Sequence, residues 1–227
     1  MKVITWNCNL KFKEKFELVN SHDPDICFIQ ECEKLKSDFF PNYKYFWTGR
    51  NENKGLGVLT KKNDFFIDET HNKDLINFLP IRSDGLKLLG VWSFNHRASK
   101  FGSEVSGNTI DAINFYKDWF GDNDERCIVA GDFNNSIIWD KKGNDNNFNN
   151  INGHLVDLGF VSNYHKLKDE GFGKESCATF FHTKKESKKY HIDYIYSKNL
   201  NPLKLKVGSY AEWISYSDHS PLIAELG

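Results

Sequence analysis

The chain has 227 residues, 39% of them hydrophobic, and its 30 Lys and Arg residues against 31 Asp and Glu residues give a net charge of -1. With 19 Phe, 9 Tyr and 6 Trp it can fill a sizeable core, which excludes an intrinsically disordered chain. The near-zero net charge excludes a general attraction to polyanions, so any contact with nucleic acid has to be local.

The five cysteines are odd in number and show no C-x-x-C spacing. Several lie in or beside apolar runs typical of strands, which favours buried thiols in a reducing compartment over disulfides. The first residues contain no apolar stretch typical of a signal peptide, and no later run approaches the length of a membrane span. We therefore expect a cytoplasmic protein without a membrane partner.

The chain opens with a predicted strand, helix and strand. Lys2–Asn7 alternates in polarity and then ends at a polar cluster with Asn9, which is typical of a strand. Apolar residues at helical spacing from Phe12 to Val19 predict a short amphipathic helix. Asp25–Glu31 is an apolar run that ends in a carboxylate. Such a β-α-β opening normally gives two parallel neighbouring strands.

The middle of the chain predicts further strands and one helix. Polar connections between the strand-like runs favour antiparallel pairing there. These runs are Tyr43–Thr48, Gly55–Thr60 and Leu86–Phe94. Ser106–Phe120 carries apolar residues on one helical face and is followed by Gly121, so we expect a helix.

Cys127–Ala130 is an unbroken apolar run, typical of a strand buried on both faces, and Gly131, Asp132 and Asn134 follow where it ends. An ionised carboxylate buried without a partner is costly, so a core has no need of Asp132 at this place. An Asp-x-Asn sequence after a strand is also a common turn. The choice between a turn and a functional site therefore depends on the other polar residues of the chain.

The last third is again rich in predicted strands. Asn135–Asn150 is mostly polar and predicts a surface loop, and Ile151–Leu158 predicts a helix. The later strand-like runs are Ala178–His182, His191–Ser197, Lys204–Tyr210 and Pro221–Leu226. No linker or repeat divides the chain, so we expect one domain over residues 1–227. The mixture of strand types predicts an α/β fold, a four-layer sandwich of two packed mixed β-sheets flanked by helices.

Polar groups at the ends of the apolar runs form five short motifs. They are Trp6-Asn7-x-Asn9, Gln30-Glu31, Gly131-Asp132-x-Asn134, His191-Ile192-Asp193-Tyr194 and Ser217-Asp218-His219-Ser220-Pro221. Each motif is weak alone. As a set, their order and spacing resemble the endonuclease/exonuclease/phosphatase superfamily over essentially the whole chain. The resemblance implies a DNase I-like fold with these residues at one sheet edge, and hydrolysis of phosphoesters with a divalent cation.

The resemblance also implies roles for individual residues. Glu31, Asp218 and Asn7 are the expected ligands of Mg²⁺ or Mn²⁺, since hard oxygen donors suit such ions. Asp132 resembles the group that positions or deprotonates the attacking water. Asn134 is expected to donate a hydrogen bond to a phosphoryl oxygen. The alternatives are that the Asn residues form turns and that Glu31 is an ordinary exposed charge.

His219 resembles the family histidine that contacts the scissile phosphate. Asp193 is expected to hold it in a carboxylate–imidazole pair, which would raise the pKa of the imidazole and fix its tautomer. Whether His219 acts as a base or as a cation stays open. Asp193 also has an alternative partner in His191, two residues back on the same face of a strand.

One position departs from the family pattern. Many family members place a His or Tyr at the end of the strand that matches Leu88–Ser93, and the best register puts Trp92 there. Either His96 supplies the missing donor or the donor is absent. By analogy with oxyanion-hole deletions, a missing donor would cost about 2.7 to 4 kcal/mol.

Candidate substrate contacts come from lysines and aromatic residues. Lys184 and Lys185 lie in a lysine-rich segment before the Asp193 strand, which suits phosphate contacts, although a solvated turn fits equally well. Together with Asn9 and Trp92 they are the expected substrate-binding residues. Some aromatic residues are candidates for stacking on bases or filling an abasic gap, although such residues are more often core. These are Trp139, Phe180, Phe181 and Trp213.

The leading hypothesis is a Mg²⁺-dependent phosphodiesterase acting on DNA or RNA, similar to the exonuclease III and DNase I branches, with an abasic-site endonuclease included. DNA is the expected partner and a monomer the expected state. The alternatives are an enzyme acting on a small or lipid phosphate ester and a catalytically weakened module that binds nucleic acid or a protein. Specificity is expected from three loops, Arg97–Gly107, Asp145–Asn150 and Thr183–Tyr190.

Overall fold

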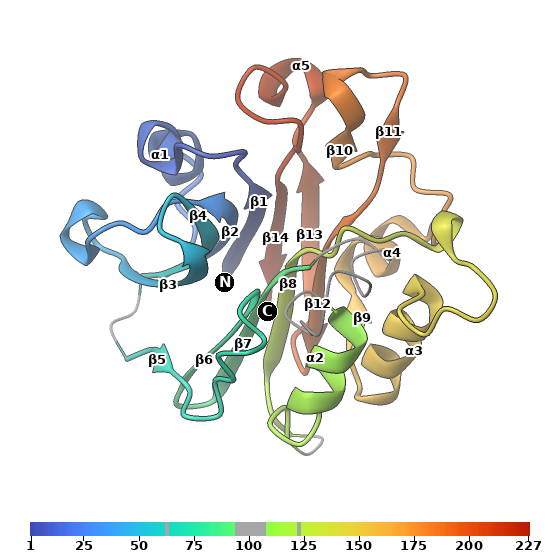
Figure 1. The fold of residues 1–227 in the computed structure, drawn as a ribbon, viewed down its shortest axis with the longest axis horizontal. Coiled ribbons are helices and arrows are strands. Elements are labelled where there is room, and N and C mark those ends of the chain that lie inside the picture. The colour runs from blue at the N-terminus through green and yellow to red at the C-terminus, as the bar shows by residue number, and fades with distance from the viewer. Residues whose placement is uncertain (62–63, 94–107, 122–123) are drawn as a thin grey trace.

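Two six-stranded β-sheets pack face to face in the computed structural model, with helices on their outer faces (Figure 1). The structure describes residues 1–61, 64–93, 108–121 and 124–227. The expected α/β sandwich of four layers is confirmed. In these ranges no helix has the length and apolarity required to cross a membrane.

The first sheet has the strand order β13-β14-β1-β2-β4-β3. β1 (Lys2–Asn7) and β2 (Ile26–Cys32) are parallel neighbours joined through α1 (Phe12–Asn20), as the β-α-β opening predicts. The remaining pairs are antiparallel. They involve β3 (Lys44–Asn51), β4 (Lys54–Thr60), β13 (Pro202–Val207) and β14 (Leu222–Leu226).

The second sheet has the order β5-β6-β7-β8-β12-β9. β7 (Leu86–Trp92) and β8 (Cys127–Asp132) are parallel, and the other pairs are antiparallel. The other strands are β5 (Phe66–Ile67), β6 (Phe78–Ser83), β9 (Val161–Ser162) and β12 (Asp193–Lys198). β10 (Phe180–Phe181) and β11 (Lys189–Tyr190) form a separate two-stranded ribbon.

Three apolar clusters hold the layers together. The cluster between the sheets includes Phe28 and Val58 from the first sheet and Leu88 and Ile128 from the second. Outside the first sheet, α1 packs through buried residues such as Phe12. Outside the second sheet, α2 (Thr109–Tyr116) and α3 (Phe148–Asp157) contribute to the third cluster. The short helices α4 (Asn163–Lys168) and α5 (Tyr210–Trp213) complete the fold.

Several predicted boundaries are wrong. The helix expected from Ile151 begins at Phe148, inside the predicted loop. The strand expected over Ala178–His182 is only two residues long, and the one expected up to Tyr210 ends at Val207. β6 was not predicted, because Pro80 lies inside it and proline argues against an inner strand. α4 and α5 were not predicted either, because they are too short to show a clear helical period.

Strand direction determines where the polar motifs meet. β1, β2 and β8 end at Asn7, Cys32 and Asp132, so their carboxyl ends bring Asn7, Glu31 and Asp132 to one edge of the sandwich. The antiparallel β12 begins there, with Asp193 opposite Asp132. The loop before β14 reaches the same edge because β14 runs antiparallel to β1.

Gly131 should be indispensable for this arrangement. Its φ is +154°, and a Cβ atom there would lie 1.8 Å from the carbonyl oxygen of Val91 on the neighbouring strand. We expect Gly131→Ala to lower the free energy of unfolding by about 3 kcal/mol or more, measured by urea denaturation. Gly153→Ala in α3 is the matched control, since nothing lies within 4 Å of its added Cβ. The control should gain about 0.5 to 1 kcal/mol, and an equally stable Gly131→Ala protein would contradict the expectation.

Candidate active site

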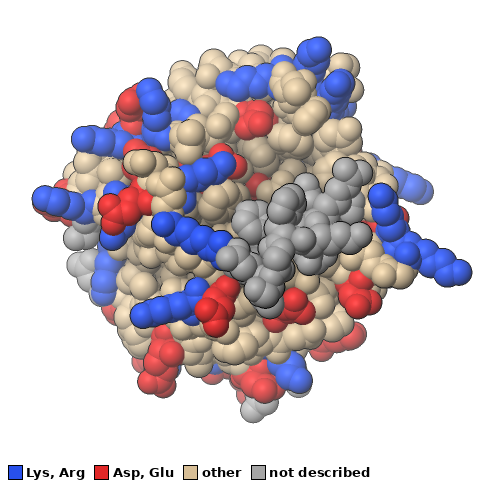
Figure 2. Space-filling model, viewed as in Figure 1, with Lys and Arg blue, Asp and Glu red and all other residues tan. Residues whose placement is uncertain are grey.

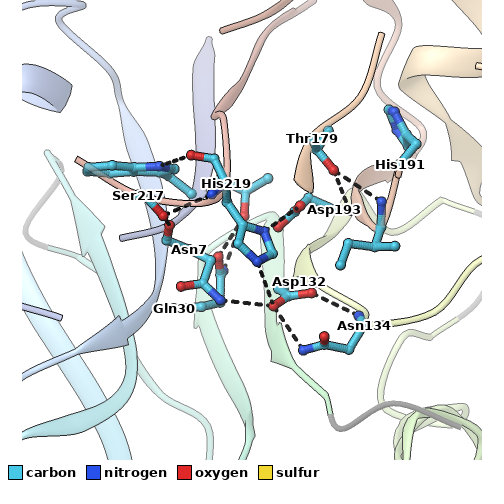
Figure 3. Close-up of polar contacts among 12 residues, drawn as sticks. Asn7, Gln30, Asp132, Asn134, Thr179, His191, Asp193, Ser217 and His219 are labelled. Atoms are coloured by element: carbon cyan, nitrogen blue, oxygen red, sulfur yellow. Dashed lines mark hydrogen bonds and ion pairs between the residues drawn. The ribbon is translucent and has the colours of Figure 1, made fainter. Parts of the chain in front are cut away.

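Asp132 is the centre of a buried hydrogen-bond network where β1 and β8 end (Figure 3). The residue is 0% exposed, and its Oδ2 accepts hydrogen bonds from Asn7 Nδ2 at 3.0 Å and from Asn134 Nδ2 at 2.9 Å. Its Oδ1 accepts from the Asn134 backbone N–H at 2.8 Å. The Asp-x-Asn sequence is therefore both a turn and part of a candidate site, because the carboxylate that closes the turn also faces Asn7.

Asn134 donates hydrogen bonds from its backbone N–H and from its side-chain Nδ2. Its side-chain amide donates to Asp132 Oδ2 and to the carbonyl oxygen of Ser93, the latter at 2.9 Å. Its backbone has a φ of +46°, a left-handed conformation that Asn tolerates better than most residues. These contacts fix the orientation of Asp132. Donation from Asn134 to a phosphoryl oxygen stays a prediction, and it would require one of the two amide contacts to break.

His219 lies between two buried carboxylates (Figure 3). Its Nδ1 donates to Asp193 Oδ2 at 2.9 Å, and its Nε2 lies 4.0 Å from Asp132 Oδ2. The expected pairing of Asp193 with His219 is present. The alternative pairing with His191 is wrong, since His191 Nδ1 donates instead to the carbonyl oxygen of Cys177 at 2.8 Å.

Three residues without a role in the sequence analysis support this network. Ser217 Oγ donates to the carbonyl oxygen of Asn7 at 2.7 Å and accepts from the backbone N–H of His219 at 3.0 Å. Trp6 Nε1 donates to the carbonyl oxygen of His219 at 3.0 Å. Thr179 Oγ1 accepts from the first backbone N–H of β12 at 3.1 Å. Trp6 and Ser217 belong to the sequence motifs, whereas no sequence signal pointed to Thr179.

Burial and mutual charge determine the protonation of this cluster. Burial raises the pKa of Asp132 to about 7, with Asp193 acting in the same direction and His219 and Asn7 opposing it. Burial alone would lower the pKa of His219, but Asp193 and Asp132 outweigh it and raise that pKa to about 10. His219 is therefore an imidazolium at neutral pH, which favours the cationic role over the basic one.

Glu31 lies at the same edge, outside the hydrogen-bond network. Its Oε2 is 3.0 Å from Lys54 Nζ, and its side chain is 20% exposed. The same Nζ lies over the Trp92 ring, 5.4 Å from the centroid. Trp92 is opposite Asp132 in the parallel β7–β8 pair, so it extends the site along this edge. Lys54 was not predicted from the sequence, where a single lysine in a polar connection gives no signal.

The other predicted residues take different places. Asp218 is next to His219 and helps to raise the pKa of that histidine. The backbone N–H of Asn9 donates to Asn7 Oδ1 at 3.1 Å. Lys184 and Lys185 are exposed in the turn after β10, outside the Asp132 network. His96 and the loop of residues 97–107 lie outside the described residues.

The candidate donors for a divalent cation are a cluster of three side chains in the structure and the three oxygen donors expected from the sequence. In the described ranges, Asp132, Asp193 and His219 offer ligand atoms within 4.8 Å of one another. A protonated imidazole has no lone pair to donate, however, and its charge already offsets the carboxylates. Glu31 instead attracts a cation in this structure, the Lys54 ammonium. Oxygen donors are the ligands that Mg²⁺ prefers, and Glu31, Asn7 and Asp218 stay the predicted ligands.

We expect Asp193→Asn to lower the pKa of His219, because it removes the carboxylate that raises this pKa most. The shift should be at least about one pH unit, followed in the ring ¹⁵N chemical shifts of His219. Asp218→Asn is the control, since Asp218 is a minor contributor and its loss should shift the pKa less. Equal titration of His219 in wild type and Asp193→Asn would contradict the expectation.

Comparisons with known proteins bear on the fold and the family. A search of curated proteins found no match. The fold is similar to a 3'-5' exonuclease from Neisseria meningitidis, with a TM-score of 0.73 at 20% identity over 99% of each chain. It is also similar to a Neisseria 3' phosphatase bound to product DNA hairpin, with a TM-score of 0.74 at 19% identity over 100% of this chain and 99% of the other.

An AP endonuclease from Archaeoglobus fulgidus gives a TM-score of 0.71 at 15% identity, over 99% of this chain and 98% of that one. At these identities the structural matches establish the fold. The family model described as endonuclease/exonuclease/phosphatase matches residues 4–219, which include every motif residue up to His219. The chain therefore belongs to the endonuclease/exonuclease/phosphatase family.

Proposed function

We propose that the protein is a divalent-metal-dependent phosphodiesterase that hydrolyses phosphodiester bonds of nucleic acid, with DNA as the expected substrate. Family membership supports phosphoester hydrolysis as the reaction class. The observation that carries the proposal is the buried row Asp132–His219–Asp193 beside Asn7, with the Glu31 carboxylate at the same edge. It combines an anionic base, a cationic imidazole and oxygen donors for a metal.

Asp132 is the proposed general base. Its raised pKa places it close to neutral pH, where a base combines availability with proton affinity. Asn7 and Asn134 hold its carboxylate in one orientation. His219 is the proposed cation at the scissile phosphate, with its Nε2 directed to the Asp132 side of the site and its Nδ1 fixed by Asp193.

Glu31, Asp218 and Asn7 are the proposed ligands of Mg²⁺ or Mn²⁺. A divalent cation held there would neutralise charge on the phosphate and on its leaving oxygen. The chain's own part is to present oxygen atoms at one sheet edge, which β1, β2 and the loop before β14 provide.

Aromatic rings beside the site support a nucleic-acid substrate. The Phe180 ring lies 4.7 Å from the His219 ring and 6.2 Å from Tyr190, whose ring lies 5.0 Å from Trp139. These three aromatic side chains are partly exposed, so they are available for stacking on bases. Phe181 and Trp213 are buried, and for them the core interpretation applies.

The charged surface supports a polyanionic substrate as well. Figure 2 shows Lys and Arg side chains, interspersed with Asp and Glu side chains, beside a hollow near the centre of the face seen in Figure 1. Lys184 and Lys185 belong to the exposed turn that follows Phe180, and they remain proposed phosphate contacts. Local positive charge of this kind would compensate for the near-zero net charge of the chain.

The test is hydrolysis with Mg²⁺ on a panel of abasic duplex, intact duplex, single-stranded DNA, RNA, a DNA hairpin with a 3'-phosphate, and a soluble phosphoinositide. We expect cleavage of a nucleic-acid substrate that EDTA abolishes. Asp132→Asn should lower kcat by about 10²- to 10⁴-fold through loss of the base. His219→Gln should lower it by about 10²- to 10³-fold through loss of a charged donor.

His154→Gln is the control for the histidine change, because His154 lies on α3 and contacts Asn114 rather than this site. Hydrolysis of the inositide alone would move the protein to the small-ester class. The enzymatic proposal would be refuted if no substrate is hydrolysed and Mg²⁺ does not raise the Tm. A ligand that binds the folded state has to raise its stability.

The pH dependence of kcat/KM tests the base assignment. Asp132 accepts a proton only when ionised, so the rate should fall as the pH drops through about 7, with a slope near one, and be level above it. A bound cation favours the ionised carboxylate and would move this limb to lower pH. A second fall is expected near pH 10, where His219 loses its proton. The substrate is a diester because its phosphate does not titrate in this range. A rate without any acidic limb over the pH range in which the protein stays folded would refute the assignment.

A further inference from the structure

The Lys54 ammonium beside Glu31 has no role in the proposed function. Lys54 begins β4, and its Nζ lies 3.0 Å from Glu31 Oε2 and 5.4 Å from the centroid of the Trp92 ring. We propose that Lys54 is a substrate-binding residue whose ammonium, supported on the Trp92 ring, contacts a backbone phosphate of the nucleic acid. This inference rests on the proposed function and adds to it a residue that sets substrate affinity.

The strands place Lys54 at the catalytic edge. β4 runs antiparallel to β2 with Gly55 opposite Cys32, so Lys54 lies across from the end of β2 that carries Glu31. β7 packs closely on β4. A Cβ atom added at Gly90 on β7 would lie only 3.3 Å from Leu56 Cδ2 on β4. Two residues further along β7, Trp92 is therefore close enough to support the lysine.

The same combination of side chains recurs among the described residues, so the combination by itself assigns no role to Lys54. Two other groups join a lysine, a glutamate and a tryptophan, Lys34–Glu52–Trp47 and Lys87–Glu125–Trp119. The Lys34 group is a neighbour of the Lys54 group, since Trp47 Nε1 donates to the carbonyl oxygen of Cys32 at 3.2 Å and Glu52 is two residues before Lys54. The Lys87 group lies away from this edge. Lys87 lies near the opposite end of β7 from Trp92.

The location of the Lys54 group gives it a different role. Its glutamate is a proposed metal ligand, and its tryptophan is opposite Asp132 in the β7–β8 pair. The Lys54 side chain is 42% exposed, so its ammonium is accessible to a ligand. Ion pairs with this much exposure contribute little to stability, which leaves recognition as the better explanation.

The chemistry links the lysine to both metal and substrate. A divalent cation at Glu31 competes with the ammonium for one carboxylate, and the two positive charges repel each other. The face of the Trp92 indole attracts the ammonium and can retain it nearby. A phosphate oxygen then supplies the anionic partner that the lysine has lost. Lys54 thus provides a charged donor at a strand end where the Trp92 ring face offers none.

The test measures DNA binding by fluorescence anisotropy in an Asp132→Asn background, where the substrate is not cleaved. Adding Lys54→Met should weaken binding by about three- to tenfold and reduce the slope of log Kd against log salt by about one. Lys54→Arg should keep most of the DNA affinity and most of the salt slope. Lys87→Met is the matched control and should change neither, because its lysine–glutamate–tryptophan group lies away from the site. Thermal unfolding confirms that each variant is folded.

Magnesium titration by calorimetry, without nucleic acid, gives a second readout. Lys54→Met removes a competing positive charge, so Mg²⁺ should bind more tightly, on the order of fivefold. Lys87→Met should leave the affinity unchanged. Unchanged or weaker Mg²⁺ binding by Lys54→Met, or DNA binding with an unaltered salt slope, would overturn the inference for Lys54 alone. If the wild type hydrolyses no nucleic acid of the panel, the proposed function fails, and this inference fails with it.

Discussion

The site depends on the burial of two carboxylates opposite each other in neighbouring strands. Asp132 and Asp193 are 0% and 1% exposed, and two negative charges so placed repel each other strongly in a medium of low dielectric constant. The His219 imidazolium between them offsets this repulsion. Hydrogen bonds with Trp6 and Ser217 hold the loop before β14, which carries His219. The charge balance of the site and the position of this loop therefore depend on each other.

The site has two halves of different character. Around Asp132 the groups are buried and joined by hydrogen bonds between side chains and backbone, which suits chemistry that requires fixed orientation. Around Glu31 the groups are more exposed, with a lysine, a carboxylate and an aromatic ring in contact. In the proposed function, that half is the binding surface, where the lysine and the carboxylate would exchange partners with a phosphate and a metal.

The sandwich explains why these halves meet. Parallel β1 and β2 bring Asn7 and Glu31 to one end of the first sheet, and parallel β7 and β8 do the same for Trp92 and Asp132 in the second. Close packing at Gly131 and Gly90 allows the chain to approach its neighbours where a side chain would interfere. Strand ends from both sheets thus bring together a cluster of polar side chains that neither sheet could build alone.

The sequence by itself determined the apolar strands over residues 2–7, 25–31 and 127–130, the polar groups at their ends, and the family, because periodicity and motif order are properties of the chain. Only the tertiary structure decided which groups are partners. Asp193 pairs with His219 rather than with nearby His191, and Asn7 reaches Asp132 across 125 residues of sequence. The position of Lys54 between Glu31 and Trp92 likewise depends on strand register and sheet packing. These contacts are long-range, and local sequence patterns carry no information about which distant strand ends will meet.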